Sequence, residues 1–194
     1  MRFVVAPDAT PLDPQVVVGL KPNIVTQEEL NEFEANNIAA AIRWIPTSRI
    51  LKRGYPTVTA LLRLHKAMFD RTWKWAGKYR SIDTTIGIER YRVPMELKSL
   101  CDDTHFWIAD DVYGWDERAA RFHHRLVQIH PFNNGNGRHS RLATDILLRQ
   151  NGRREFTWGS HSIIPEGPTR RAYIDALQAA DEGEIAPLLA FART

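Results

Sequence analysis

The residues best suited to chemistry lie in one short segment, His130 to Arg141, which reads HPFNNGNGRHSR. The helix expected before this segment must end at Pro131, because proline has no N–H to donate. His130 therefore lies at a helix C-terminus, where the helix dipole favours a cation. This placement indicates a histidine that accepts a proton, which is the role of a general base.

An anion-binding site is expected directly after this histidine. Gly135 and Gly137 flank Asn136 at the start of the next helix, and glycine lets a ligand approach the backbone closely. The first N–H groups of a helix have no partner within it and attract anions. Arg138 and Arg141, about one turn apart, are expected to converge on the same end. A base, backbone donors and two arginines together predict phosphoryl or nucleotidyl transfer.

The segment resembles the signature of the Fic/Doc family, H-x-F-x-[D/E]-G-N-G-R-x-x-R, and matches it at every specified position except the acidic one, which is Asn134. The resemblance covers roughly residues 25–194 and is closest to the subgroup called mobile mystery protein B. Other segments that carry it are residues 75–80, 86–88, 122–129 and 179–181.

The resemblance implies an all-α Fic fold, a single helical domain with a small β-hairpin flap. It implies a protein adenylyltransferase that transfers AMP from ATP to a serine, threonine or tyrosine hydroxyl of a target protein. A toxin–antitoxin context, with an antitoxin or other regulatory partner, belongs to the same expectation.

The family's roles can be carried onto this sequence position by position. His130 would take the proton from the target hydroxyl as it attacks the α-phosphate, and Phe132 would anchor the loop in the core. Arg138 would hold the inner phosphates and Arg141 the terminal one, beside an anion hole of Gly135, Asn136 and Gly137. The flap would align a target segment by strand addition, with docking residues Thr85, Ile86, Gly87 and Ile88.

Asn134 stands where the family signature has an acidic residue that binds Mg²⁺. Asparagine keeps a carbonyl oxygen but brings no charge, so we expect the affinity for the metal to fall. Three alternatives follow for the chain. It is a slower adenylyltransferase, it transfers a different nucleotidyl or phosphoryl group, or it is a Fic-fold binding or regulatory module with weak or no catalysis.

Glu34 lies on the apolar face of the helix predicted after Thr26, where a carboxylate needs a cationic partner. Many Fic proteins carry an inhibitory glutamate in the pattern [S/T]-x-x-x-E-[G/N], which pairs with the second arginine of the signature. The resemblance gives Glu34 this role with Arg141 as partner, although Leu30 and Ala35 depart from the pattern. The alternative is a structural ion pair with another arginine.

The surrounding elements predict a single, mainly helical domain at residues 26–194, preceded by an extended arm at residues 1–25. A capping box at Thr26–Glu29 starts the first long helix. Alternation of apolar residues within 82–88 indicates the hairpin, or else an irregular loop. Helical spacing predicts helices over residues 26–45, 58–73, 95–108, 115–129, 138–150 and 169–180.

The composition fits a soluble globular domain, with 194 residues, a net charge of +3 and 43% hydrophobic residues. No stretch approaches the roughly 18 apolar residues of a membrane span, and no signal peptide is evident, so a cytoplasmic chain without a membrane partner is expected. The single cysteine, Cys101, is expected in the core.

Basic charge is concentrated in the second half of the chain. Residues 138–171 contain seven arginines against three carboxylates, which places the anion site there. No basic face interleaved with aromatic residues is recognisable, so nucleic-acid binding is disfavoured.

Overall fold

A computed structural model describes residues 14–52, 54–159 and 167–194. Within these ranges the chain forms nine α-helices, two short 3-10 helices and no β-strand. The helices are α1 (Pro14–Val17), α2 (Gln27–Trp44), α3 (Arg49–Lys52), α4 (Val58–Phe69), α5 (Val93–Ala109), α6 (Trp115–Ile129), α7 (Asn136–Gln150), α8 (Pro168–Asp181) and α9 (Ala186–Arg193), with the 3-10 helices η1 (Ile45–Thr47) and η2 (Arg90–Arg92).

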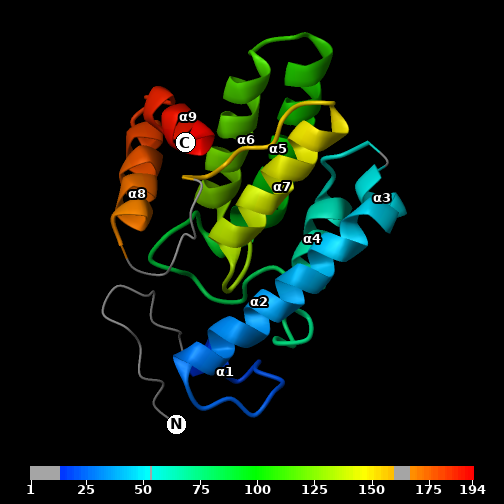
Figure 1. Cartoon of the computed structure of the whole chain (residues 1–194), viewed down its shortest axis with the longest axis vertical. Helices are drawn as coiled ribbons and strands as arrows, with labels where there is room; N and C mark the ends of the chain where they lie inside the picture. Colours follow the sequence, from blue (N-terminus) through cyan, green and yellow to red (C-terminus); the bar gives the residue numbers. More distant parts are fainter. Residues whose placement is uncertain (1–13, 53, 160–166) are drawn as a thin grey trace.

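The centre of the molecule is a bundle in which α6 packs against both α5 and α7 (Figure 1). Helix α2 runs obliquely past this bundle and packs along α4. Helices α8 and α9 form a helical hairpin that packs on α6, on the side of the bundle away from α3 and α4 (Figure 1). The signature segment forms the short loop between α6 and α7 and the first turns of α7, so the bundle fixes the site from both ends.

The apolar faces predicted from helical spacing form the main core. Leu61 and Leu64 of α4 and Phe122 of α6 are fully buried. Cys101 of α5 is buried as predicted, and burial raises the pKa of its thiol to about 12. A thiol in that state is a packing residue and not a nucleophile. No helix in the described ranges is long and apolar enough to cross a membrane.

The start of α2 confirms the predicted capping box. The Thr26 side chain accepts a hydrogen bond from the Glu29 N–H at 3.2 Å, and the Glu29 carboxylate accepts one from the Thr26 N–H at 3.0 Å. The helix ends at Trp44, and Pro46 lies in the 3-10 turn that follows. This helix matters because it carries Glu34 to the signature segment.

The β-hairpin flap is not confirmed, because residues 81–89 form bends and irregular backbone without strand pairing. The physical reason lies in Arg80, whose guanidinium donates to the carbonyls of both Ile82 and Ile88. These two carbonyls lie on opposite arms of the flap, and a shared side-chain donor takes the place of a ladder of backbone hydrogen bonds between the arms.

Other differences from the sequence prediction are local. The predicted extended arm contains the helical turn α1, and its Val16 and Ile24 are buried, while residues 1–13 lie outside the described residues. The helix predicted over 58–73 ends at Phe69, and α9 was not predicted. At eight residues, α9 is too short to show a clear helical period.

Candidate active site

His130 is the C-cap of α6 and adopts a left-handed backbone conformation with a φ of 52°. This conformation is unfavourable for a residue with a side chain, so its surroundings must hold it. The Arg80 Nε donates to the His130 carbonyl at 2.7 Å, and the Arg80 N–H donates to the Pro131 carbonyl at 2.9 Å. Arg80 therefore fixes the backbone that aims the imidazole.

The tautomer of His130 follows from the hydrogen bond that its side chain makes in the described part of the chain. Its Nδ1 lies 3.3 Å from the Val127 carbonyl, which can only accept, so Nδ1 carries the proton and Nε2 has the free lone pair. Burial is the main cause that lowers the pKa of His130 to about 4. The hydrogen bond to Val127 raises this pKa, and the positive charge of Arg80 lowers it further. Burial therefore opposes the cation that the helix terminus favours. The ring is neutral at pH 7, which is the form that accepts a proton.

The loop after His130 is closed by Asn136. Its side-chain oxygen accepts from the Phe132 N–H at 2.9 Å, and its side-chain nitrogen donates to the Phe132 carbonyl at 2.8 Å. Phe132 is fully buried, as expected of an anchor, and stacks on His65 with ring centroids 3.6 Å apart. Only the backbone of Asn136 is left for an anion hole, because its side chain is used within the loop.

His65 of α4 supports the same loop, a role that the sequence did not predict. Its Nδ1 accepts from the Gly77 N–H at 2.9 Å, so its Nε2 carries the proton and donates to the Asn134 carbonyl at 3.1 Å. Burial holds the pKa of His65 well below its usual value. Its position on the apolar face of a predicted helix gave no sign of this role.

The anion site lies at the N-terminus of α7. Gly135, the N-cap, has a φ of 77°, and a Cβ added there would lie 2.5 Å from the Phe69 ring, so only glycine fits. The Gly135 N–H already donates to the Asn134 side-chain oxygen at 2.7 Å. The N–H groups of residues 136–138 have no acceptor in the described part of the chain. They are the donors available to an anion.

Arg141 lies on one side of this N-terminus. A Cβ added to Gly137 would first meet the Arg141 Nη1 and the Tyr173 hydroxyl, each at 3.9 Å. The Arg141 guanidinium lies over the Tyr173 ring, 5.4 Å from its centroid, and burial lowers its pKa. Among the described residues no carboxylate lies within 4.0 Å of it.

Arg138 lies on the other side and is paired. Its Nη1 is 2.7 Å from a carboxylate oxygen of Glu34, which is 2% exposed. The second oxygen of Glu34 accepts from the Trp73 indole N–H at 2.6 Å. The predicted Glu34–Arg141 pair is therefore wrong, and the alternative of another arginine is confirmed. Arg138 faces α2, whereas Arg141, three residues further along α7, faces α8.

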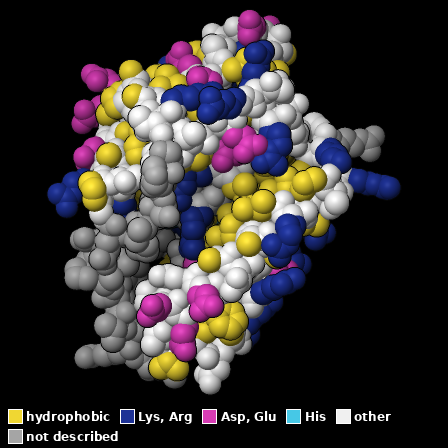
Figure 2. Space-filling view, viewed as in Figure 1, with side chains coloured by type: hydrophobic (Ala, Val, Ile, Leu, Met, Phe, Trp, Pro, Cys, Tyr) yellow, Lys and Arg dark blue, Asp and Glu magenta, His cyan; other side chains and the backbone are white. Residues whose placement is uncertain are grey.

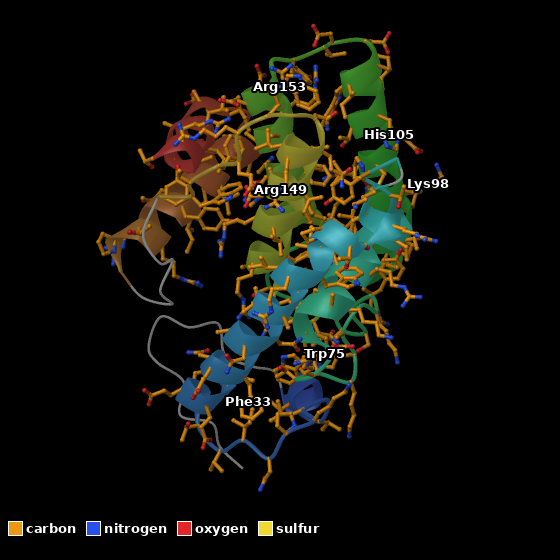
Figure 3. The ribbon with its side chains drawn as sticks, turned by 45° about the vertical axis from the view of Figure 1, so that its right-hand side comes forward. Phe33, Trp75, Lys98, His105, Arg149 and Arg153 are labelled. Carbon is orange, nitrogen blue, oxygen red and sulfur yellow. The ribbon has the colours of Figure 1, made fainter. Side chains whose placement is uncertain are left out.

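At the start of α7 the two arginines thus have different partners, Glu34 of α2 for Arg138 and the Tyr173 ring of α8 for Arg141. Figure 2 shows Lys and Arg side chains in a hollow near the centre of this face, where α2 passes the start of α7. Two other arginines of the basic stretch lie away from the start of α7. Arg149 and Arg153 are near the far end of α7 (Figure 3), and Arg149 pairs with Glu155.

The flap, residues 81–89, packs against His130. A Cβ added to Gly87 would lie 2.6 Å from the His130 Cβ, so the flap backbone packs directly on this histidine. Thr85 and Ile86 are exposed, and Ile88 is partly buried. The Ser81 N–H donates to the Asn133 side chain at 3.2 Å, a further link between flap and loop.

The metal position does not fit Mg²⁺ well. Asn134 offers one neutral oxygen, which already accepts the Gly135 N–H. In the described ranges no three His, Cys, Asp or Glu side chains are grouped to hold a metal ion. A hard divalent cation requires several oxygen ligands, usually including a carboxylate.

Two groups of known proteins are similar to this chain. The protein adenylyltransferase Fic of Culex quinquefasciatus is 30% identical over 162 residues, and that of Aedes aegypti is 28% identical over 162 residues. Both alignments cover 81% of this chain and 31% of the relative, so the chain spans about a third of the length of these curated relatives.

Solved structures share the fold. The N-terminal Fic domain of Bep8 from Bartonella sp. 1-1C superposes with a TM-score of 0.71 at 17% identity, over 89% of this chain and 87% of that one. A Bep effector Fic domain with bound ADP from Bartonella quintana gives 0.69 at 19% identity, over 90% and 87%. Fic-1 of Caenorhabditis elegans gives 0.68 at 23% identity, over 92% and 52%.

The all-α Fic fold expected from the sequence is therefore confirmed, while the mobile mystery protein B subgroup stays a prediction. The family model described as Fic/DOC family matches residues 55–148. These residues include the base, the loop and both arginines. Over this segment the chain matches the Fic/DOC family.

Proposed function

We propose that this chain is a protein adenylyltransferase, which transfers AMP from ATP to a hydroxyl side chain of a target protein. The relatives from mosquitoes carry that activity in their names. The observation that carries the proposal is a neutral His130 at the start of the loop that leads into the free N–H groups of α7, where Arg138 and Arg141 also lie. A base next to a phosphate site is the arrangement that this transfer needs.

The chemical step follows from the tautomer of His130. Its Nε2 lone pair takes the proton of the target hydroxyl, and the hydroxyl oxygen forms a bond to the α-phosphorus of ATP. The bond from that phosphorus to the oxygen bridging to the β-phosphorus breaks, and pyrophosphate leaves with the electron pair. The helix N-terminus and the arginines stabilise the negative charge on the phosphate oxygens. The imidazolium then returns its proton to water.

The two arginines would divide the triphosphate between them. We assign the inner phosphates to Arg138 and the terminal phosphate to Arg141, with the backbone of Gly135, Asn136 and Gly137 as the anion hole. The N–H groups of Asn136 and Gly137 are free for this role, whereas that of Gly135 must first leave the Asn134 side chain. The open side of Gly137, which faces the Arg141 guanidinium, supports this assignment. A planar guanidinium suits the geometry of phosphate oxygens.

Glu34 would then hold the enzyme in a resting state. Its carboxylate occupies Arg138, and the Trp73 indole fixes it in place. A phosphate group that approached Arg138 would find its guanidinium already paired with Glu34, and it would be repelled by the buried negative charge of that carboxylate. We therefore propose that Glu34 inhibits ATP binding, through the first arginine of the signature and not through the second.

We expect Asn134 to bind Mg²⁺ weakly. A neutral Asn134 oxygen that already accepts a hydrogen bond supports low Mg²⁺ affinity. When bound, Mg²⁺ neutralises phosphate charge. The same observation favours a second candidate function, a Fic-fold binding or regulatory module with weak or no catalysis. Transfer of another nucleotidyl or phosphoryl group is a variant of the proposed adenylyltransferase activity.

The resemblance to the family supports four further features of the proposed function. They are a serine, threonine or tyrosine as the modified residue, an antitoxin or other regulatory partner, a toxin–antitoxin context and a cytoplasmic location. The exposed Thr85 and Ile86, beside His130, support the flap as the place where the target docks.

Incubation with ATP labelled at the α-phosphate tests the proposal. The protein is added to a cell lysate with Mg²⁺, and labelled protein bands are followed for wild type, His130→Ala, Glu34→Gly and Asn134→Asp. We expect Glu34→Gly and Asn134→Asp to increase labelling, and His130→Ala to lower it at least about 100-fold.

The matched control is His105→Ala, which removes an exposed histidine of α5 (Figure 3) and should leave labelling unchanged. If no variant labels any protein, and circular dichroism shows all of them folded, adenylyl transfer is refuted. Isothermal titration with ATP then separates the two remaining outcomes, because a nucleotide-binding module still binds it.

A further inference from the structure

We propose that Arg80 is a positioning residue that joins the flap, residues 81–89, and the backbone of His130 into one mechanical unit. The joint is a property of the fold, and only its effect on catalysis rests on the proposed function. The side chain of Arg80 is fully buried between the two parts.

On the catalytic side, Arg80 binds two successive carbonyl groups. Its Nε donates to the His130 carbonyl at 2.7 Å, and its own N–H donates to the Pro131 carbonyl at 2.9 Å. His130 has a left-handed backbone that its surroundings must impose, and hydrogen bonds from a cation are stronger than neutral ones. Arg80 thus holds the turn that directs the imidazole.

On the flap side, the same guanidinium binds both arms. Its Nη1 donates to the Ile82 carbonyl at 3.1 Å, and its Nη2 donates to the Ile88 carbonyl. No strand pairing holds the flap in the described residues, so this side chain is the common partner of the two arms. A planar fork with donors in fixed directions can serve three carbonyl groups at once, which a lysine ammonium on a single stem does less well.

The flap is also in direct contact with the base. A Cβ added to Gly87 would lie 2.6 Å from the His130 Cβ and 3.4 Å from the Arg80 Nη2. The tip of the flap therefore covers both residues, and a shift of the flap changes the solvent exposure of the imidazole. Because Arg80 contacts both, the flap and the base are expected to loosen together.

The charge environment supports positioning over simple stabilisation. The one carboxylate near the Arg80 guanidinium in the described ranges is Asp83, at 3.4 Å and 65% exposed. Burial lowers the pKa of Arg80, with Asp83 acting against it. A buried cation with one exposed partner contributes little net stability. What Arg80 supplies is a fixed arrangement of backbone carbonyl groups.

Hydrogen–deuterium exchange on the full chain tests the joint without nucleotide or target. Wild type is compared with Arg80→Lys, which keeps the charge and loses the fork. We expect exchange in residues 81–92 and in residues 130–133 to speed up together, each at least about tenfold, while α8 and α9 are unchanged.

The matched control is Arg118→Lys, since Arg118 is a second buried arginine and bonds Asp111 and the Tyr113 carbonyl away from the flap. Faster exchange in the flap alone, or the same pattern in Arg118→Lys, would overturn the proposal. Gly87→Ala is the second variant, because its new Cβ pushes the flap off His130 while Arg80 is intact. It should also loosen residues 130–133, and unchanged exchange there would count equally against the joint.

The imidazole itself gives a second readout. The charged group that faces His130 is Arg80, and burial is the main reason for its low pKa. In an NMR titration, with the His130 signal assigned from His130→Gln, Arg80→Lys should raise the pKa from about 4 towards 6.5. An unchanged pKa would show that the flap does not depend on Arg80. If adenylyl transfer is also observed, kcat should fall in Arg80→Lys with KM for ATP unchanged. Absence of labelling by wild type and by both Glu34→Gly and Asn134→Asp would refute the proposed function and leave the exchange test intact.

Discussion

The two arginines of the signature segment lie three residues apart and have opposite surroundings. Arg138 faces α2 and pairs with Glu34, a carboxylate that is 2% exposed and is held by the Trp73 indole. Arg141 faces α8, where its guanidinium lies over the Tyr173 ring, with no carboxylate within 4.0 Å in the described ranges. One phosphate ligand is occupied by the protein itself and the other is open.

This difference shows how a small domain can control a phosphate site with one helix. A carboxylate that occupied both arginines would compete with ATP over the whole triphosphate. Glu34 reaches only Arg138, so the open Arg141 can bind a phosphate while the ion pair is still closed. The two sides should therefore respond differently to mutation.

Removal of the arginines one at a time should give the largest difference. Arg141→Ala is expected to weaken ATP binding roughly 100-fold, because it deletes charge-assisted hydrogen bonds that are free to form. Arg138→Ala should weaken it only about threefold, since Arg138 is already used by Glu34. Isothermal titration with ATP measures both.

Two further measurements sharpen this result. Arg138→Ala leaves Glu34 buried without its cation, so the free energy of unfolding in urea should fall by about 3 kcal/mol. In a Glu34→Gly background the two arginines should become nearly equivalent. Arg153→Ala, an exposed arginine near the end of α7, is the control for loss of positive charge. Equal losses from Arg138→Ala and Arg141→Ala in wild type would contradict the asymmetry.

Opening the ion pair from the other partner should have the next largest effect. Glu34→Gln keeps an oxygen for the Trp73 indole but removes the charge that holds Arg138. ATP affinity is expected to rise about tenfold, the typical size of one released charge contact. Glu32→Gln, which changes an exposed carboxylate of the same helix, should leave affinity unchanged. A similar rise in both variants would point to net charge instead of the ion pair.

Acid should destabilise the core on both sides of the site. Burial lowers the pKa of His123 to about 3 and that of His139 to about 4, and it also lowers those of His65 and His130. These groups contribute stability above the unfolded pKa of about 6.5, and lose it as pH falls towards 4. Burial raises the pKa of Asp145 to about 7, so this one carboxyl stabilises the folded state as pH falls and opposes the effect of the four histidines.

Urea unfolding at several pH values measures the net effect. Stability should fall between pH 6.5 and 4 by about 1.4 kcal/mol per pH unit for each net proton taken up on unfolding. His105→Gln changes an exposed histidine and should not alter the slope. A flat profile over this range would show that the four histidines are not held neutral.

Most of the fold could be predicted from the sequence because apolar spacing and capping act locally. The α2 capping box and the ends of α6 are where their residues indicate. The flap could not be predicted, because alternation of apolar residues does not reveal that the buried Arg80 would take its carbonyl groups. A side-chain donor that binds carbonyl groups two and eight residues away leaves no period in the sequence.

The site was predictable where residues are close in sequence, and not where they meet only in the fold. Gly135 and Gly137 at the start of α7 needed only a local pattern. The choice of Arg138 over Arg141 as partner of Glu34 depends on how α2 packs, which no local pattern encodes. Tyr173 was missed for the same reason, since it comes from α8 and stands in an ordinary amphipathic helix.

Tyr173→Phe should have the smallest effect on ATP affinity. It tests whether the Tyr173 hydroxyl helps to position the Arg141 guanidinium for phosphate. The hydroxyl lies 2.9 Å from the His123 Nε2, and it borders the space in front of Gly137 together with the Arg141 Nη1. Phenylalanine keeps the ring beneath the guanidinium and removes only the hydroxyl, so Arg141 stays in place with less fixed geometry. ATP binding is expected to weaken about threefold, the worth of one modest hydrogen bond. Tyr91→Phe, which changes a tyrosine that is 77% exposed, is the control. If Tyr173→Phe binds ATP like wild type, Arg141 is held by the ring alone, and the hydroxyl belongs to the packing of His123 and not to the phosphate site.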